Sequence, residues 1–101
     1  MDTFSALAEP TRRRIIEMIA TSGRMSATDI SDKFKVSPPA ISQHLKVLRE
    51  AKLVDMEKSA QMRIYTINTN SLLEIGDWTS KMVKLWDKRL DRLDELLKST
   101  K

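Results

Sequence analysis

The hydrophobic period of this chain changes from helical to strand spacing near residue 53, and that change restricts its fold more than any other feature. Before it, apolar residues recur every three or four positions, as in Ile41, Leu45 and Leu48. After it, residues 53–57 and 62–67 follow a two-residue period and predict two short strands joined through Ser59-Ala60-Gln61. The helical period returns after about residue 70. The expected fold is therefore mainly α with one small β-hairpin.

The chain has only two glycines and three prolines, so helix should dominate. Capping residues then predict where the five helices begin and end. A short helical turn over residues 2–8 places Phe4 and Leu7 on one side. Pro10 suits the first turn of a second helix, which Gly23 should end.

Two capped helices follow in close succession. Ser26 is placed to cap a helix of about two turns, and Ser37 followed by Pro38 opens a helix that runs to about Ala51. Asn70 or Ser71 is expected to cap the last helix, which continues to about residue 98. We therefore expect one domain over residues 1–101, with a helix-turn-helix at about 26–51, a two-stranded wing at about 53–67 and a terminal helix at about 70–98.

This order of elements predicts a winged helix-turn-helix, whose second helix fits the major groove of double-stranded DNA. On the expected outer face of that helix, Gln43 can pair with adenine, Ser42 can donate or accept, and Lys46 can reach guanine or phosphate. The helix N-terminus is expected to offer free backbone N–H groups to a phosphate. The expected DNA-binding residues are Ser37, Pro38, Pro39, Ser42, Gln43, His44, Lys46, Arg49, Lys58 and Arg63.

Two of these features have a plainer explanation. The polar outer face is also what any solvated amphipathic helix shows, but its small polar residues beside a capped, proline-stiffened start favour DNA binding. His44 lies between the buried and exposed sides of the helix, which favours packing or a phosphate contact over metal ligation, because partner ligands are missing.

Composition excludes several classes of function. With no cysteine and one histidine, the chain has no disulfide, Cys-ligated metal site or nucleophile–base pair, so we expect no enzyme, cofactor or metal. The longest uncharged runs, residues 36–45 and 64–73, are far shorter than the ~18 residues that cross a bilayer. No export signal follows Met1, so we expect a cytoplasmic protein that does not bind membranes.

The charge is concentrated in the part with the expected DNA-binding elements. The net charge is +4, and residues 1–68 contribute +3 of it through eleven basic and eight acidic side chains. The excess is consistent with a polyanionic partner. Residues 69–101 are nearly balanced.

The terminal helix predicts a homodimer. At 1.5 Å per residue, about 28 residues would extend ~42 Å, past a domain whose expected radius of gyration is ~13 Å. An apolar stripe runs along that helix, and exposed stripes of this size are unusual in monomers. The alternative is that the two tryptophans only cover the monomer's own core. The expected dimer-interface residues are Phe4, Leu7, Ile75, Trp78, Met82, Leu85, Trp86, Leu90 and Leu93.

The chain resembles the ArsR family of bacterial and archaeal transcriptional repressors in three stretches. They are residues 6–16 (ALAEPTRRRII), residues 36–54 (VSPPAISQHLKVLREAKLV) and Arg63-Ile-Tyr65. The similarity extends over nearly all of residues 4–68. It implies a homodimeric winged-helix repressor that leaves its operator when a small effector binds. It also implies that Ser42, Gln43, His44 and Lys46 lie at or beside the DNA.

The chain departs from that family in two places. Many members sense metals through cysteines near the helix before the recognition helix, or through Asp and His ligands on the last helix. Residues 27–34 contain no cysteine and the last helix no histidine, so cysteine-type metal sensing is not expected. The wing tip also lacks the usual glycine, which predicts a longer or looser turn.

Two other binding functions remain open. In a protein–protein adaptor, the last helix would pair with a different protein, and the isolated chain would be a monomer at micromolar concentration. An RNA-binding winged helix would need stacking surfaces, yet only Tyr65 among the five aromatic residues is expected to be exposed on the wing.

Overall fold

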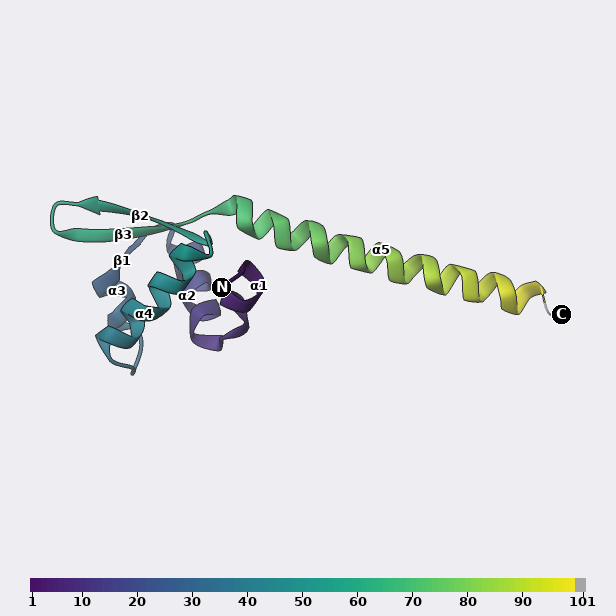
Figure 1. The fold of residues 1–101 in the computed structure, drawn as a ribbon, viewed down its shortest axis with the longest axis horizontal. Helices are drawn as coiled ribbons and strands as arrows, with labels where there is room; N and C mark the ends of the chain where they lie inside the picture. Colours follow the sequence, from purple (N-terminus) through teal and green to yellow (C-terminus); the bar gives the residue numbers. More distant parts are fainter. Residues whose placement is uncertain (100–101) are drawn as a thin grey trace.

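The computed structural model describes residues 1–99 and shows a small helical body from which one long helix projects (Figure 1). Five helices and three strands make up the described chain. In order they are α1 (Thr3–Ala8), α2 (Pro10–Ser22), β1 (Met25–Ser26), α3 (Ala27–Asp32), α4 (Pro38–Glu50), β2 (Val54–Ser59), β3 (Met62–Ile67) and α5 (Thr69–Ser99). The expected winged helix-turn-helix is confirmed. Residues 100–101 of the expected domain lie outside the described residues.

The capping residues account for most of the helix boundaries. The Asp2 carboxylate accepts from the Ser5 amide at the start of α1, and the Ser26 hydroxyl accepts from the Asp29 amide at the start of α3. Gly23 ends α2 with a φ of 86°, a conformation that glycine adopts without steric cost. These local signals are confirmed because each depends on residues within one helical turn.

The sheet has a third strand that the sequence did not predict. Its strand order is β1-β3-β2, with Met25 opposite Tyr65 and Ser26 opposite Ile64. A two-residue strand is too short to show a period, so only the tertiary pairing defines it. Tyr65 of β3 is buried in the core cluster with Val54, contrary to the expected exposure on the wing.

The wing turn is also tighter than expected. Ser59 pairs with Met62, which leaves Ala60 and Gln61 as a two-residue turn with Ala60 at a φ of 57°. The expectation of a longer turn is wrong because the ladder holds the register as far as the turn, while the left-handed conformation at one alanine costs only about 1–2 kcal/mol.

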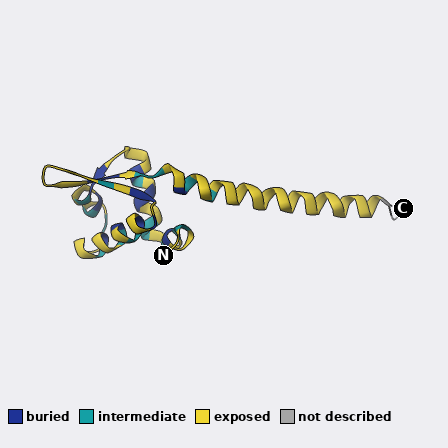
Figure 2. Ribbon diagram, turned by 45° about the horizontal axis from the view of Figure 1, so that its top comes forward, coloured by how far each residue is buried: buried dark blue, intermediate teal, exposed yellow. Residues whose placement is uncertain are grey.

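The core is formed by apolar faces of α2, α3 and α4 against the sheet, and α1 closes one side. Ile15, Ile30, Leu45 and Leu48 are almost completely buried in it. Figure 2 shows that this burial stops shortly after α5 begins. Residues 76–98 of α5 are all exposed.

Asn70 and Ser71 do not cap α5, contrary to expectation. The Asn68 side chain accepts from the Asn70 amide, whereas the Ser71 hydroxyl donates to the Lys52 carbonyl oxygen at 2.6 Å. Ser71 therefore connects the start of α5 to the end of α4, a non-local contact that the local pattern could not indicate.

The end of α4 contains a strained residue that gives a stability prediction. The Lys52 amide donates to the Arg49 carbonyl and the Leu53 amide to the Leu48 carbonyl, which is a Schellman motif with Lys52 at φ 61°. We expect Lys52→Gly to be more stable than Lys52→Ala by about 0.5–1 kcal/mol, because relief of left-handed strain exceeds the extra entropy of an unfolded glycine. Urea denaturation at one fixed protein concentration measures the difference, and equal midpoints would contradict the proposed strain.

Candidate nucleic-acid interface

The N-terminus of α4 is built by one serine and two prolines. The Ser37 hydroxyl accepts from the Ala40 amide at 3.3 Å, and Pro38 and Pro39 occupy the first two helical positions. Prolines have no N–H group, and the Ala40 N–H is already bonded. The backbone N–H groups of the first turn of α4 are therefore absent or bonded, contrary to the expectation that this end offers free N–H groups to a phosphate. The prolines stiffen the start of the helix instead.

The two faces of α4 divide as the sequence predicts. Ile41, Leu45 and Leu48 are buried against the body. The opposite face is in solvent, and the candidate DNA-binding residues exposed on α4 or at its start are Ser37, Pro38, Pro39, Ser42, Gln43, Lys46 and Arg49. An exposed helix face with hydroxyl, amide and cationic groups has the chemistry that base edges and phosphates require.

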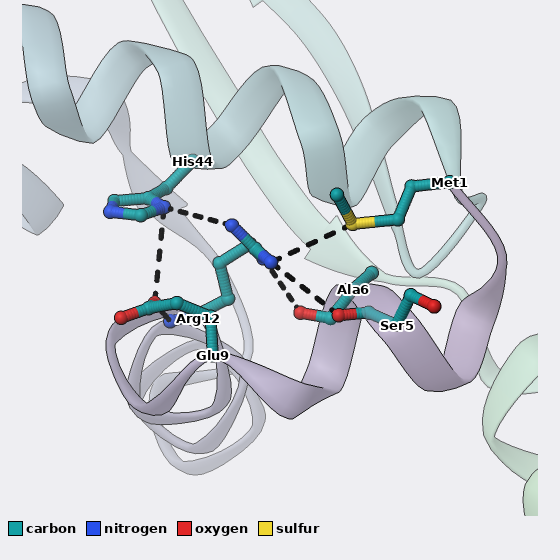
Figure 3. A network of polar contacts seen from close by, with 6 residues as sticks. All are labelled: Met1, Ser5, Ala6, Glu9, Arg12 and His44. Carbon is teal, nitrogen blue, oxygen red and sulfur yellow. Dashed lines mark hydrogen bonds and ion pairs between the residues drawn. The ribbon is translucent and has the colours of Figure 1, made fainter.

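His44 differs from the other candidates because its ring is half-buried and bonded. Its Nδ1 atom lies 3.3 Å from Arg12 Nη1 and 3.9 Å from Glu9 Oε2 (Figure 3). The sequence left packing and a phosphate contact open for this residue, and the structure adds two specific polar neighbours. Within residues 1–99, no cluster of three or more His, Asp or Glu side chains could hold a metal ion.

Arg12 and Glu9, which both lie beside His44, are not predicted as site residues from the sequence. Glu9 caps α2 by accepting from the Arg12 amide at 2.9 Å. Burial would raise the pKa of the Glu9 carboxyl, but hydrogen bonds from Arg12 and Thr11 and the nearby His44 outweigh it and lower that pKa. The cap could have been inferred from Glu9-Pro10, but no local signal indicates a contact between residues 12 and 44.

The basic residues of the wing share one face. Lys58 lies directly opposite Arg63, and the neighbouring pairs on that face are Met56 with Tyr65 and Val54 with Ile67. Asp55 and Glu57 lie on the other face. Like charges directly opposite each other destabilise a ribbon, so this pair is more favourable beside an anion.

The candidate dimer residues lie on α1 and α5. Phe4 and Trp78 are in edge-to-face contact, with ring centroids 5.3 Å apart. Leu7 and Ile75 are half-buried. The other candidates are exposed, namely Met82, Leu85, Trp86, Leu90 and Leu93, and Trp86 is 61% exposed. Trp78, which is 52% exposed, contacts the body through Phe4, whereas Trp86 lies in the part of α5 that projects from it.

The chain is similar in sequence and fold to known helix-turn-helix transcriptional regulators. The helix-turn-helix domain family matches residues 7–57. The transcriptional repressor SdpR of Bacillus subtilis is 33% identical over 89 residues, which are 88% of this chain and 98% of that protein. An ArsR-like transcriptional regulator from Rhodococcus superposes with a TM-score of 0.79 at 26% identity, over 92% of this chain and 87% of that one. The chain belongs to the ArsR family.

This ArsR-family protein is also similar in sequence and fold to a second solved structure. A possible transcriptional regulator for arsenical resistance is 36% identical, with a TM-score of 0.73 over 92% of this chain and 93% of that one. As the sequence predicts, the ArsR-family protein is a DNA-binding transcriptional repressor, and its relatives are transcriptional regulators. Within residues 1–99, no helix is long and apolar enough to span a membrane.

Proposed function

We propose that this ArsR-family repressor binds a palindromic operator as a homodimer, with α4 of each copy in a major groove. The observation that supports this most strongly is the combination of two exposed features. The Ser42 and Gln43 side of α4 is in solvent, and so is the apolar face of α5.

The exposed apolar face of α5 supports pairing with a second copy. At 100° per residue, the side chains from Ile75 to Leu93 that were expected at the interface fall within about 140° of the helix circumference. Figure 2 shows this part of α5 in solvent along its length. The radius of gyration is 19.4 Å, against ~13 Å for a compact chain of this size. A second α5, with α1 alongside through Phe4, covers this surface most simply.

Each candidate residue has a chemical role in this proposal. Gln43 and Ser42 contact base edges, and Lys46 contacts a base or the adjacent phosphate. Ser37, with the Pro38-Pro39 start of α4, positions the helix against the DNA backbone together with His44 and Arg49. On the wing, Lys58 and Arg63 follow the phosphates, which would relieve the repulsion between them.

Gln43→Ala tests base recognition. We expect it to cost about 1–3 kcal/mol of specific binding and to relax discrimination at one position per half-site, because an amide that pairs with adenine is lost. Fluorescence anisotropy on the duplex that the wild type selects from a random pool, and on a scrambled duplex, measures both affinities. An equal loss on the two duplexes would refute the role of Gln43 in base recognition.

Lys58→Ala is the contrasting case on the wing. We expect it to weaken binding to both duplexes alike and to make binding less dependent on salt, because a phosphate contact releases counterions without regard to sequence. Anisotropy titrations at several salt concentrations give the slope. An unchanged slope would show that Lys58 does not contact a phosphate.

In this proposal, residues 1–101 act as one DNA-binding domain in the cytoplasm and catalyse no reaction. A small effector would release the repressor from its operator. Cysteine ligands cannot bind this effector, since the chain has no cysteine.

An adaptor function would instead give a monomer at micromolar concentration. RNA binding is less favoured because Tyr65, the expected stacking residue of the wing, is buried.

A further inference from the structure

Behind the DNA-facing surface of α4, one guanidinium joins three helices (Figure 3). Arg12 of α2 donates through Nε to the Ala6 carbonyl at 2.7 Å and through Nη2 to the Ser5 carbonyl at 3.4 Å, both on α1. Its Nη1 atom lies 3.3 Å from Nδ1 of His44 on α4. The rigid, planar fork of an arginine suits several partners at once, which a lysine could not replace.

The partner of Arg12 determines which nitrogen of His44 holds the proton. A guanidinium has donors only, so a ring nitrogen bonded to it must accept. In the neutral ring Nδ1 is then unprotonated and Nε2 holds the N–H. Figure 3 shows Nε2 on the side of the ring away from Arg12. His44 therefore presents an N–H donor directed away from the cluster.

The other titratable neighbour of this ring is Glu9. Its Oε2 atom lies 3.9 Å from the same Nδ1, too far for a hydrogen bond, and it accepts from the Arg12 amide instead. A carboxylate favours a proton on Nδ1 and Arg12 disfavours one. The shorter contact, to Arg12, fixes the form of the neutral ring.

We propose that Arg12 is a positioning residue for DNA binding, which orients His44 and fixes its tautomer so that Nε2–H donates to a backbone phosphate. The proposal rests on the proposed function only in placing α4 against DNA. Arg12 does not touch the DNA in this arrangement and acts through His44. Because Arg12 is also bonded to α1, whose Phe4 contacts Trp78 of α5, the orientation of this donor depends on how α1 packs.

The tautomer can be tested without DNA. His44 is the only histidine, so its ring nitrogens are assigned without ambiguity in long-range ¹⁵N–¹H correlation spectra at about pH 8, above the usual titration range of histidine. We expect protonated Nε2 and unprotonated Nδ1 in the wild type, and loss of this preference in Arg12→Gln. Protonated Nδ1 in the wild-type spectrum would overturn the proposal.

A double-mutant cycle tests the action through His44. The probe is the duplex that the wild type selects from a random pool. We expect about tenfold weaker binding for His44→Phe and for Arg12→Gln, and about tenfold, not hundredfold, for the double variant. Arg13→Gln removes the same charge from the next, exposed arginine and should weaken binding equally in the wild-type and His44→Phe backgrounds.

The outcomes separate this proposal from the proposed function. Losses that multiply in the double variant would show that Arg12 acts independently of His44 and would overturn the proposal, and so would unchanged binding in His44→Phe. If the wild type selects no duplex, the proposed function fails. The wild-type ring spectrum still decides the tautomer in that case, and also if a variant does not fold.

Discussion

Leu93→Glu is expected to make the protein monomeric at micromolar concentration and to weaken operator binding by about a hundredfold or more. Leu93 is 54% exposed on the apolar face of α5. In a two-fold dimer both copies would bury the introduced carboxylate, and an unpaired buried charge costs about 3–5 kcal/mol. DNA binding falls with dimerisation because the two α4 helices would no longer be held one turn of DNA apart.

Leu73→Glu is the matched control for this experiment. Leu73 is a leucine on the same helix and is 63% exposed, but twenty residues at 100° place it about 160° away from Leu93 around the axis. The two variants have the same composition and charge. Sedimentation velocity and anisotropy should show a dimer with nearly wild-type affinity for Leu73→Glu. A Leu93→Glu variant that stays dimeric would contradict the proposed interface.

Leu48→Ala is expected to lower the free energy of unfolding by about 2–5 kcal/mol. Leu48 is completely buried, and its carbonyl accepts from the Leu53 amide in the motif that ends α4. Removing its side chain leaves a cavity between α4 and the rest of the core. Urea denaturation at fixed protein concentration measures the loss.

Leu73→Ala tests whether burial is the cause of that loss. The substitution removes the same atoms from an exposed leucine, so we expect a change within about 0.5 kcal/mol. Similar destabilisation by Leu48→Ala and Leu73→Ala would mean that α4 is not packed on the core as the structure shows.

The features that the sequence predicts correctly are determined within one or two helical turns. The Ser37 cap, the Gly23 stop and the buried stripe of α4 each depend on side chains three or four residues apart. The exposed side of α4 follows from the same period, so most of the candidate residues could be assigned to that face from the sequence.

The features that the sequence did not predict depend on pairs far apart in the chain. β1 exists only because Met25 and Ser26 pair with β3 some forty residues later. The Ser71 hydroxyl reaches back to the Lys52 carbonyl, and Arg12 reaches forward to His44. Neither of these side-chain contacts repeats with a period, so neither leaves a pattern in the sequence.

Selection of bound duplexes from a random DNA pool tests the central claim most directly, that two copies of α4 recognise one operator. The account predicts a two-fold symmetric consensus whose half-sites are centred about 10 base pairs, or 34 Å, apart or a multiple of that distance, because successive major grooves on one side of the duplex have this spacing. Enrichment of a single unpaired half-site, or of no sequence at all, would contradict it.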